Sequence, residues 1–256
     1  MPLLEVNKVC KEFGGLMASN QVSFEVNEGE IVSVIGPNGA GKTTAFNIVT
    51  GIYTADAGSI VFDGKEITNR SPKEIVKAGI SRTFQNIRLF SNLRVIENVL
   101  LGEHLSIRYS FPDLLFQTKR FRAAEKACAQ RAIEILESID LGDCIDSYAG
   151  DLPYGKQRRL EIARAIATGA KLILLDEPAA GMNPQESEEL MAFIRSLQRK
   201  GFTILMIEHD MNLVMNVSER IYVMDYGKVI ASGTPEEVVA DPEVIRAYLG
   251  ESEEET

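Results

Sequence analysis

The chain has 256 residues, of which 45% are apolar and 25% are charged, and its formal net charge is −10. This composition is typical of one large globular domain or of two closely joined lobes. Four of the acidic residues belong to the final segment ESEEET, so the rest of the chain is only mildly acidic. Proteins that mainly grip nucleic-acid phosphates need clustered Lys and Arg, so we expect no nucleic-acid partner.

The cysteines and the hydropathy pattern indicate where the protein works. Cys10, Cys128 and Cys144 lie far apart without a CxxC pair, which predicts neither a disulfide framework nor a zinc site. No segment approaches the ~18 consecutive apolar residues that a membrane span needs. We therefore expect a cytoplasmic protein, and this expectation still permits a peripheral position on the inner face of the cell membrane.

Short β-rich stretches fill the first quarter of the chain, namely LLEV, VSFEV, EIVSVIG and SIVFDG. After residue 70 the pattern becomes helical. Ser71-Pro72-Lys73-Glu74 predicts a capping box with proline at the first helical position. Helical patterns continue from Val95 to Gly102 and from about Phe111 to Ile139.

Strand and helix alternate from Lys171 onward. The strand KLILLD is followed by the helix PQESEELMAFIRSLQRK, the strand FTILMIE and a further helix. The apolar residues on one face of the first of these helices are Leu190, Phe193, Ile194 and Leu197. Continuous apolar strands between helices predict a parallel sheet covered on both sides. The pattern favours one α/β core with an inserted helical lobe over roughly residues 88–165.

A phosphate-binding motif, GxxxxGK[ST], lies between the strand EIVSVIG and the predicted helix TAFNIVTG. Its glycines let backbone N–H groups turn toward phosphate oxygens, and the helix N-terminus adds the positive end of its dipole. We expect Lys42 to reach the β and γ phosphates and Thr43 to ligate Mg²⁺. The predicted nucleotide-binding residues are Gly36, Pro37, Asn38, Gly39, Ala40, Gly41, Lys42, Thr43 and Thr44.

The segment LILLDEP supplies a second part of the predicted site. Asp176 ends an apolar strand, where its carboxylate can hold Mg²⁺, and the neighbouring Glu177 can polarise an attacking water. An Asp-Glu pair at a strand end is by itself more often a cap or a turn, so this interpretation depends on the phosphate-binding motif. A GTPase would carry NKxD, whereas Asn7-Lys8-Val9-Cys10 lacks the aspartate, and a small-molecule kinase would carry an arginine-rich lid. Hydrolysis of ATP by water is therefore favoured.

The order of five motifs resembles the nucleotide-binding subunits of ABC transporters over nearly the whole chain. These motifs are GPNGAGKTT, Phe84-Gln85, the segment 152–157, LILLDEP and His209. The resemblance implies an α/β P-loop NTPase core of mainly parallel sheet, with an N-terminal antiparallel β subdomain and an inserted α-helical subdomain. In this single ABC ATPase domain, residues 1–87 and 166–250 would form the RecA-like core with the β subdomain. Residues 88–165 would form the helical subdomain that carries the signature, and 251–256 an acidic tail.

The resemblance also implies roles for individual residues. Phe13 would stack on adenine, although a core aromatic is an alternative of equal weight. Gln85 would touch Mg²⁺ or the lytic water. His209 would hydrogen-bond the γ-phosphate, and its place after the strand TILMIE favours this role over that of a satisfied core histidine. His104 has no such support.

The segment Leu152-Pro153-Tyr154-Gly155-Lys156-Gln157 stands where the family carries the signature LSGGQ. In the family, the helix after this signature points at a γ-phosphate bound to the other subunit. Tyr154, Gly155 and Lys156 would contact that nucleotide. Pro153 offers neither a hydroxyl nor an N–H group, and Asn183 replaces the usual aspartate of a following loop. We expect a complete phosphate-binding half-site beside a weakened signature.

A finer resemblance is to the LivG-type ATPases of branched-chain amino acid uptake systems. It rests on SRTFQNIRLFSNLRVIENVL, YGKQRRLEIARA, LLDEPAAGMNP, LMIEHDMNLVM and GTPEEVVADPEVIRAYLG. It implies an ATPase that powers import through two membrane permease subunits served by a periplasmic or extracellular substrate-binding protein. Urea or amide importers and lipopolysaccharide exporters are alternatives, because an ATPase subunit does not touch the cargo. A soluble ABC protein is less favoured, because tandem cassettes and a basic linker are absent.

The resemblance implies that the working form is a head-to-tail dimer, because the family's signature reaches a phosphate held by the facing subunit. The second ATPase subunit would be an identical copy or, the option that we favour, a related ATPase. Lys42, Mg²⁺ and the signature helices would neutralise the charge of two ATP molecules. An aromatic insert would fill the core of the helical lobe or contact the membrane subunits; it comprises Tyr109, Phe111, Phe116 and Phe121.

Overall fold

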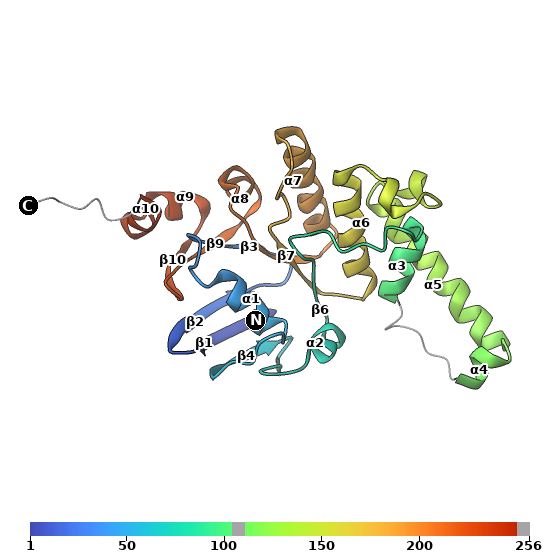
Figure 1. The fold of residues 1–256 in the computed structure, drawn as a ribbon, viewed down its shortest axis with the longest axis horizontal. Coiled ribbons are helices and arrows are strands. Elements are labelled where there is room, and N and C mark those ends of the chain that lie inside the picture. The colour runs from blue at the N-terminus through green and yellow to red at the C-terminus, as the bar shows by residue number, and fades with distance from the viewer. Residues whose placement is uncertain (104–110, 250–256) are drawn as a thin grey trace, which may run out of the picture.

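The computed structural model describes residues 1–103 and 111–249, in which two β-sheets are surrounded by helices (Figure 1). His104 and Tyr109 lie outside the described residues. Among the described residues, no helix has both the length and the apolar character to cross a membrane. The predicted class, an α/β fold with a mainly parallel core sheet and a separate antiparallel sheet, is confirmed.

The first sheet is antiparallel and has the strand order β2-β1-β4-β5. Its strands are β1 (Leu4–Phe13), β2 (Leu16–Val26), β4 (Ala57–Phe62) and β5 (Lys65–Glu66). Leu4 lies opposite Val26 on one side and Phe62 on the other, and all three side chains are buried. This sheet corresponds to the predicted N-terminal β subdomain.

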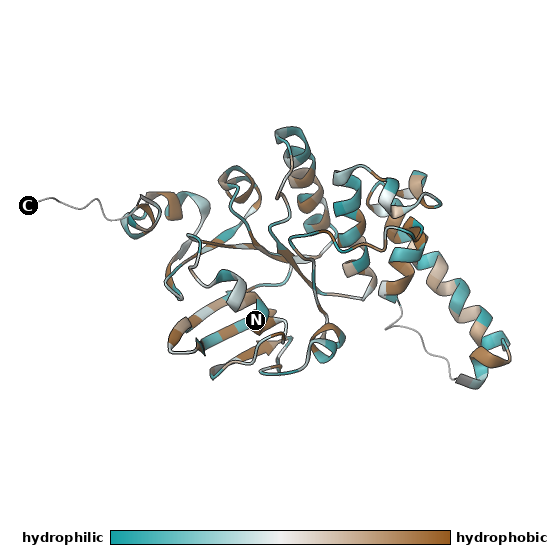
Figure 2. Ribbon diagram, in the orientation of Figure 1, coloured by the Kyte–Doolittle hydropathy of each residue, from teal (hydrophilic) through white to brown (hydrophobic). Residues whose placement is uncertain are grey.

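The second sheet has the order β10-β9-β3-β8-β7-β6, and only its edge strand β10 runs antiparallel to its neighbour. Its strands are β3 (Ile31–Ile35), β6 (Ile80–Arg82), β7 (Leu172–Asp176), β8 (Thr203–Ile207), β9 (Arg220–Asp225) and β10 (Lys228–Gly233). Every residue of β3, β7 and β8 is buried, as their continuous apolar sequences predict. The central strands are accordingly coloured as hydrophobic in Figure 2.

The α-helices of the described residues are α1 (Lys42–Val49), α2 (Pro72–Ala78), α3 (Val95–Glu103), α4 (Phe111–Leu115), α5 (Lys119–Ser138), α6 (Tyr154–Ala167), α7 (Pro184–Arg199), α8 (Met211–Val217), α9 (Pro235–Ala240) and α10 (Pro242–Leu249). Most of them lie beside the two sheets, and α3 to α6 form the inserted lobe at one end of the molecule (Figure 1). Ser71 caps α2 as predicted, because its N–H donates to Glu74 Oε2 at 2.9 Å. The sequence patterns did not identify β6, the β9–β10 hairpin, α9 or α10.

The helical lobe and the large sheet share one hydrophobic cluster. Leu136 of α5 and Leu160 of α6 belong to the same cluster as Ile173 and Leu175 of β7. The lobe is therefore packed against the core through a continuous apolar surface. Phe116 does not fill the lobe's interior, because 75% of its side chain is exposed.

Candidate nucleotide site

The phosphate-binding loop connects β3 to the start of α1, as the motif predicts. Gly36 and Gly41 adopt φ angles of 147° and 94°, which favour glycine. A Cβ atom at Gly36 would lie 2.0 Å from the Met224 carbonyl oxygen, and one at Gly41 would lie 2.4 Å from that of Ala18. No larger residue fits at either position. The two glycines allow the loop to adopt a conformation in which backbone N–H groups can point toward a phosphate at the start of α1.

Lys42 is the first residue of α1, and its side chain folds back over the loop. Its Nζ donates to the carbonyl oxygens of Gly36 at 2.7 Å and Pro37 at 2.9 Å. Burial lowers the pKa of Lys42, and the negative charge of Glu177 partly opposes this shift. A cation that is partly stripped of water at a helix N-terminus can bind phosphate oxygens strongly.

Glu177 contacts two residues, Gln85 and His209, that were predicted from separate motifs. Gln85 Nε2 donates to Glu177 Oε2 at 2.5 Å, and His209 Nε2 lies 3.0 Å from Glu177 Oε1. The φ angle of Glu177 is 45°, which is unusual for a residue other than glycine. Such strain persists where the surroundings hold a residue in place, and it is concentrated at functional sites.

Asp176 is buried at the end of β7 and forms an ion pair that the sequence did not reveal. Arg82 Nη2 donates to Asp176 Oδ2 at 2.5 Å, and Arg82 Nη1 donates to Asn47 Oδ1 at 2.7 Å. Because both side chains of the ion pair are mostly buried, Arg82 compensates the charge of Asp176 where solvent screening is weak. Arg82 therefore fixes the position of this carboxylate.

A cavity of about 510 Å³ joins the phosphate-binding loop to the carboxylate of Glu177. Its lining residues are Leu16, Met17, Ala18, Asn38, Gly39, Ala40, Gly41, Lys42, Thr43, Thr44, Glu177, His209, Tyr226 and Gly227. A volume of this size holds a small molecule such as a nucleotide. Most of the predicted loop residues and both Glu177 and His209 therefore face one space, whereas Gly36 and Pro37 do not line it.

Phe13 does not line this cavity. It is the last residue of β1, with 41% of its side chain exposed, and its ring makes an edge contact with Tyr53 at 5.2 Å between centroids. Leu16 and Met17 at the start of β2 contribute to the cavity instead. Phe13 is therefore not a core residue, and its stacking on adenine stays a prediction.

The signature residues lie at the N-terminus of α6 and do not line the cavity around Lys42. The Tyr154 hydroxyl donates to the Ala180 carbonyl oxygen at 2.9 Å. Lys156 Nζ lies 3.1 Å from Cys144 Sγ and 3.3 Å from Asp143 Oδ2, and these hydrogen bonds raise the pKa of Lys156. A Cβ atom at Gly155 would meet no neighbouring atom, so the helix start is open at that point.

Asn183 has a structural role in the loop after Glu177. Its Oδ1 accepts the N–H of Glu186 at 3.0 Å, and Glu186 Oε2 accepts the N–H of Asn183 at 3.0 Å. This reciprocal capping box begins α7. The asparagine therefore supports the helix start as an aspartate does, but it brings no negative charge.

A buried ion pair on α6 joins the signature helix to the loop that carries Gln85. Arg158 is fully buried and donates to Glu161 Oε2, to the Phe84 carbonyl and to the Gln85 carbonyl, each at 2.8 Å. Glu161 Oε1 in turn accepts the N–H of Arg88 at 3.2 Å. Sequence reasoning missed this pair, although charged residues on an otherwise apolar helix face were a usable signal.

Glu208 is a second buried carboxylate that the motifs did not reveal. Only 3% of its surface is exposed, and it accepts the N–H groups of Ala179 at 2.7 Å, His209 at 2.9 Å and Asp210 at 3.2 Å. Burial raises the pKa of Glu208, and these hydrogen bonds oppose the shift. Glu208 thus links the loop after Glu177 to the loop that presents His209.

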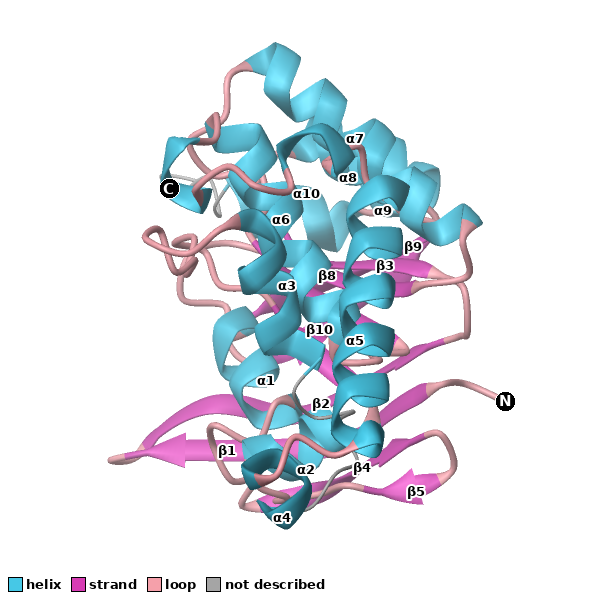
Figure 3. Cartoon of the chain, turned by 90° about the vertical axis from the view of Figure 1, so that its right-hand side faces the viewer, coloured by secondary structure: helices cyan, strands magenta, loops and turns pink. Residues whose placement is uncertain are grey.

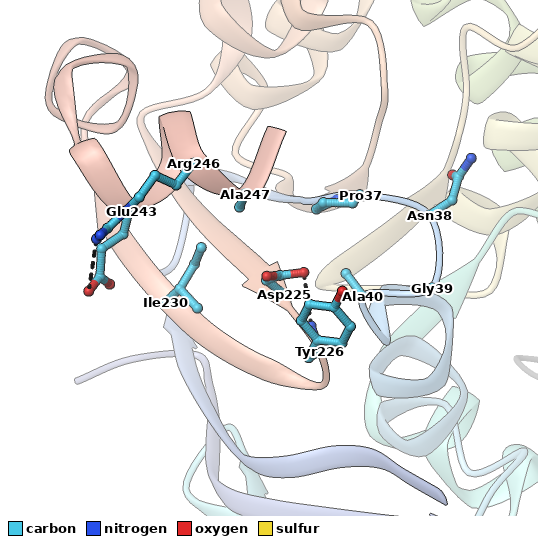
Figure 4. Close-up of a pocket in the computed structure, with 10 residues that line it drawn as sticks. All are labelled: Pro37, Asn38, Gly39, Ala40, Asp225, Tyr226, Ile230, Glu243, Arg246 and Ala247. Carbon is cyan, nitrogen blue, oxygen red and sulfur yellow. Dashed lines mark hydrogen bonds and ion pairs between the residues drawn. The ribbon is translucent and has the colours of Figure 1, made fainter. Parts of the chain in front are cut away.

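A second hollow, of about 770 Å³, lies on the other side of the phosphate-binding loop, between the loop and α10. Figure 4 shows the Tyr226 ring beside Ala40, with Glu243 and Arg246 of α10 across the hollow. It contains neither Lys42 nor Glu177. This hollow is larger than the first but lacks the groups that phosphate chemistry requires.

A GxxxxGK[ST] lysine that shares a cavity with a hydrogen-bonded glutamate, at the carboxyl edge of a mainly parallel sheet, is the arrangement of the P-loop nucleoside-triphosphate hydrolases. The comparisons with known proteins narrow this class. The family model of the ABC transporter matches residues 19–180, and that of the branched-chain amino acid ATP-binding cassette transporter matches residues 228–254. The chain belongs to the ABC transporter family, as one of its ATP-hydrolysing subunits.

Individual relatives agree with this assignment. The high-affinity branched-chain amino acid transport ATP-binding protein LivG of Salmonella typhimurium is 48% identical over 252 residues, covering 98% of this chain and 99% of the relative. The ADP conformation of the ABC transporter cassette MJ1267 is 37% identical with a TM-score of 0.83, covering 98% of this chain and 100% of that one. A dimeric cassette, MJ0796 bound to ADP and Pi, is 26% identical with a TM-score of 0.73, covering 91% and 98%. The predicted resemblance to LivG-type ATPases is confirmed.

Proposed function

We propose that the chain hydrolyses ATP in the cavity between Lys42 and Glu177 and thereby powers the import of branched-chain amino acids through membrane permease subunits. The observation that carries this proposal is the arrangement of Gln85 and His209 on the two carboxylate oxygens of Glu177. Two hydrogen bonds orient the carboxylate, as a general base that acts on water requires. The cargo is inferred from the names of the relatives.

The phosphates would lie against the start of α1. Lys42 would exchange its carbonyl partners, Gly36 and Pro37, for oxygens of the β and γ phosphates. The free N–H groups of the first turn of α1 would bind further oxygens, with the helix dipole in the favourable direction. This arrangement holds the triphosphate and stabilises the charge that develops as the terminal phosphate leaves.

Glu177 would orient a water molecule toward the γ-phosphorus and accept its proton. The oxygen of this water forms the new bond to phosphorus, and the bond to the β-phosphate oxygen breaks, which releases ADP and phosphate. His209 is placed to hold the glutamate and to contact the γ-phosphate. Gln85 contacts Glu177, so a movement of the glutamate would also move the loop that carries Gln85.

Oxygen donors of Thr43, Asp176 and Gln85, which lie in or next to the residues of this site, would fit Mg²⁺. Thr43 lines the cavity, and Asp176 ends the strand that leads to Glu177. With Gln85, these residues would provide a hydroxyl, a carboxylate and an amide oxygen, which are the hard ligands that Mg²⁺ prefers. When bound, the metal neutralises phosphate charge.

A second ATPase subunit would complete the site. Tyr154, Gly155 and Lys156 begin α6 outside the cavity around Lys42, so they are available to a nucleotide held by another subunit. A related cassette is dimeric with ADP and Pi bound. We propose a dimer with a related ATPase, with an identical partner as the alternative.

A groove of about 520 Å³ beside the Gln85 loop would receive a permease subunit. It is lined by Val76, Ser81, Arg82, Phe84, Arg88, Phe90, Leu101, Gly102, Glu161, Arg164, Ala165 and Thr168. Arg82 contacts Asp176 and Glu161 holds the Gln85 loop, so a permease segment in this groove would be coupled to the catalytic residues. The protein would then lie on the inner face of the membrane, and a substrate-binding protein would deliver cargo on the far side.

The division into a core (1–87 and 166–250), a helical subdomain (88–165) and a tail (251–256) is retained as part of this proposal.

Reconstituted transport tests the cargo. The chain, its permease subunits and its ATPase partner would be placed in vesicles with the cognate binding protein, and ATP-dependent uptake of labelled leucine, isoleucine and valine would be measured. We expect uptake that is lost with Glu177→Gln. Uptake of urea in place of these amino acids, or export of lipopolysaccharide, would identify one of the alternative systems instead.

A further inference from the structure

The last residues of α4 and the start of its connection to α5 expose apolar side chains at the end of the helical lobe. Leu114, Leu115 and Phe116 follow one another, and 64% of Leu115 and 75% of Phe116 are accessible to solvent. Contiguous large apolar residues on a surface indicate a contact with another apolar phase or partner. Residues 114–122, which include these three, are called the lobe tip below.

Basic residues follow directly on the apolar ones. Lys119, Arg120 and Arg122 begin α5 and are exposed, and the first turn of this helix contains no acidic residue. The acidic residues on either side are Asp113, whose Oδ1 accepts the Thr118 hydroxyl at 2.9 Å, and Glu125. The lobe tip itself is therefore positively charged on a chain whose formal net charge is −10.

This placement of cations opposes the local stability of the helix. The N-terminus of a helix carries the positive end of its dipole, so acidic residues stabilise the first turn and cations destabilise it. A sequence that breaks such a local rule commonly does so for a function elsewhere. Exposed apolar residues beside Lys and Arg form the pattern of a segment that lies at the surface of an anionic membrane.

The lobe tip lies on the side of the molecule where the membrane is expected, a step that rests on the proposed function. The groove proposed for a permease is lined partly by Val76 of α2. α2 and α4 both lie toward the lower edge of the molecule in Figures 1 and 3, which share a vertical axis. The α9 and α10 helices lie at the opposite end from α4 (Figure 1).

We propose that the lobe tip binds anionic phospholipid, with Leu115 and Phe116 inserted among the headgroups and Lys119, Arg120 and Arg122 on the lipid phosphates. The apolar side chains gain from leaving water, and the cations gain from the negative surface potential of the leaflet. The contact would hold the helical lobe beside the membrane while the nucleotide site works.

Flotation with vesicles tests this proposal on the full chain. Vesicles of equal parts phosphatidylglycerol and phosphatidylcholine would be compared with vesicles of phosphatidylcholine alone. We expect binding to the anionic vesicles only, and weaker binding at about 1 M salt than at about 0.1 M, because the Debye length falls from about 10 Å to about 3 Å. Lys119→Gln/Arg120→Gln/Arg122→Gln should weaken partitioning about a hundredfold, since each cation near an anionic surface contributes about fivefold.

Variants elsewhere on the surface distinguish binding by the lobe tip from non-specific binding by other exposed apolar or basic side chains. Leu115→Ser/Phe116→Ser should weaken partitioning at least about tenfold, because the inserted apolar area is lost. Val239→Ser/Ile245→Ser removes exposed apolar residues from α9 and α10, and Arg199→Gln/Lys228→Gln removes exposed cations. Both control variants should bind vesicles as the wild type does. Circular dichroism and thermal unfolding would verify that each variant is folded.

Two results would overturn the proposal. One is equal vesicle binding by the wild type and both lobe-tip variants. The other is no binding to anionic vesicles by the wild type; if the lobe-tip variants also lose permease-stimulated ATP hydrolysis, the surface is assigned to the permease protein. ATP hydrolysis measured on the same samples keeps the two proposals apart: activity without vesicle binding removes only the lipid contact, and vesicle binding without activity removes only the proposed function.

Discussion

Arg158 of the signature helix donates a hydrogen bond to the Gln85 carbonyl oxygen at 2.8 Å. The side chain of Gln85 donates in turn to Glu177. A displacement of α6 is therefore passed by direct contacts to the carboxylate beside the phosphate-binding loop. Because α6 would face the nucleotide of the second subunit, these contacts offer a physical route by which the two sites affect each other.

Removal of one member of the buried pair should destabilise the protein strongly. Arg158→Met leaves Glu161 buried without its cation, so we expect a loss of roughly 3–5 kcal/mol in the free energy of unfolding. Arg158→Met/Glu161→Leu removes both charges, so the double variant should lose less than the single one. Urea unfolding would measure all of these values.

An exposed arginine provides the control for this pair. Arg199→Met should change the free energy of unfolding by no more than about 0.5 kcal/mol, because surface substitutions have small effects. A loss for Arg158→Met as small as that of the control would show that the buried pair does not hold the Gln85 loop.

Glu208 should make stability depend on pH. Burial raises its pKa, so the folded protein keeps a proton at pH values where the unfolded chain has lost it. Its contribution to the free energy of unfolding is full below the ordinary glutamate pKa of about 4.3 and decreases as the pH rises through the raised value.

The matched variant for this test is Glu208→Gln, which cannot titrate. Denaturant unfolding from about pH 4.5 to about pH 7.5 should show that the wild-type value minus the variant value decreases as the pH rises. A difference that is constant over this range would mean that Glu208 has the same pKa in the folded and unfolded states.

The altered signature should limit the site of the second subunit. Pro153 precedes α6 without a side-chain hydrogen bond to the helix start. Pro153→Ser restores a hydroxyl donor worth about 0.5–1.5 kcal/mol, so turnover at the partner's site should rise about two- to thirteenfold. Measuring ATPase with each half-site disabled in turn would locate the gain. Faster turnover at the site that uses the unaltered Pro153 signature than at the other site would contradict the weakened-signature hypothesis.

Several residues of the candidate site were predictable because each sits at the end of an element with a clear local pattern, whereas Leu16, Met17 and Tyr226 of the cavity lining belong to no recognised motif. Asp176 and Glu177 follow a continuous apolar strand and His209 follows another, and the carboxyl ends of parallel strands meet at one edge of a sheet. The same logic applies to Lys42 at the start of α1. Local sequence thus contained the information that positions these groups.

Arg82, Arg158 and Glu208 were not predictable in the same way, because each binds at least one group that is distant in sequence. Arg158 bonds to carbonyl oxygens 73 and 74 residues away, and Arg82 pairs with a carboxylate 94 residues away. A charged residue in a predicted helix or strand usually lies on a solvent-exposed face. Only the packed structure shows that the side chains of Arg82, Arg158 and Glu208 are buried. The β9–β10 hairpin is a different case, because its strands pair across the short turn between Asp225 and Lys228, and a local signal was available.

The central claim is that Glu177 is the base for ATP hydrolysis in a cavity where Lys42 holds the phosphates. The most direct measurement is ATP binding and single-turnover hydrolysis by the dimer with Glu177→Gln, with Lys42→Ala as the control that should lose binding. We expect Glu177→Gln to bind ATP as tightly as the wild type, to hydrolyse it about 10²- to 10⁴-fold more slowly, and to keep the dimer closed for longer. Hydrolysis near the wild-type rate by Glu177→Gln would contradict the account.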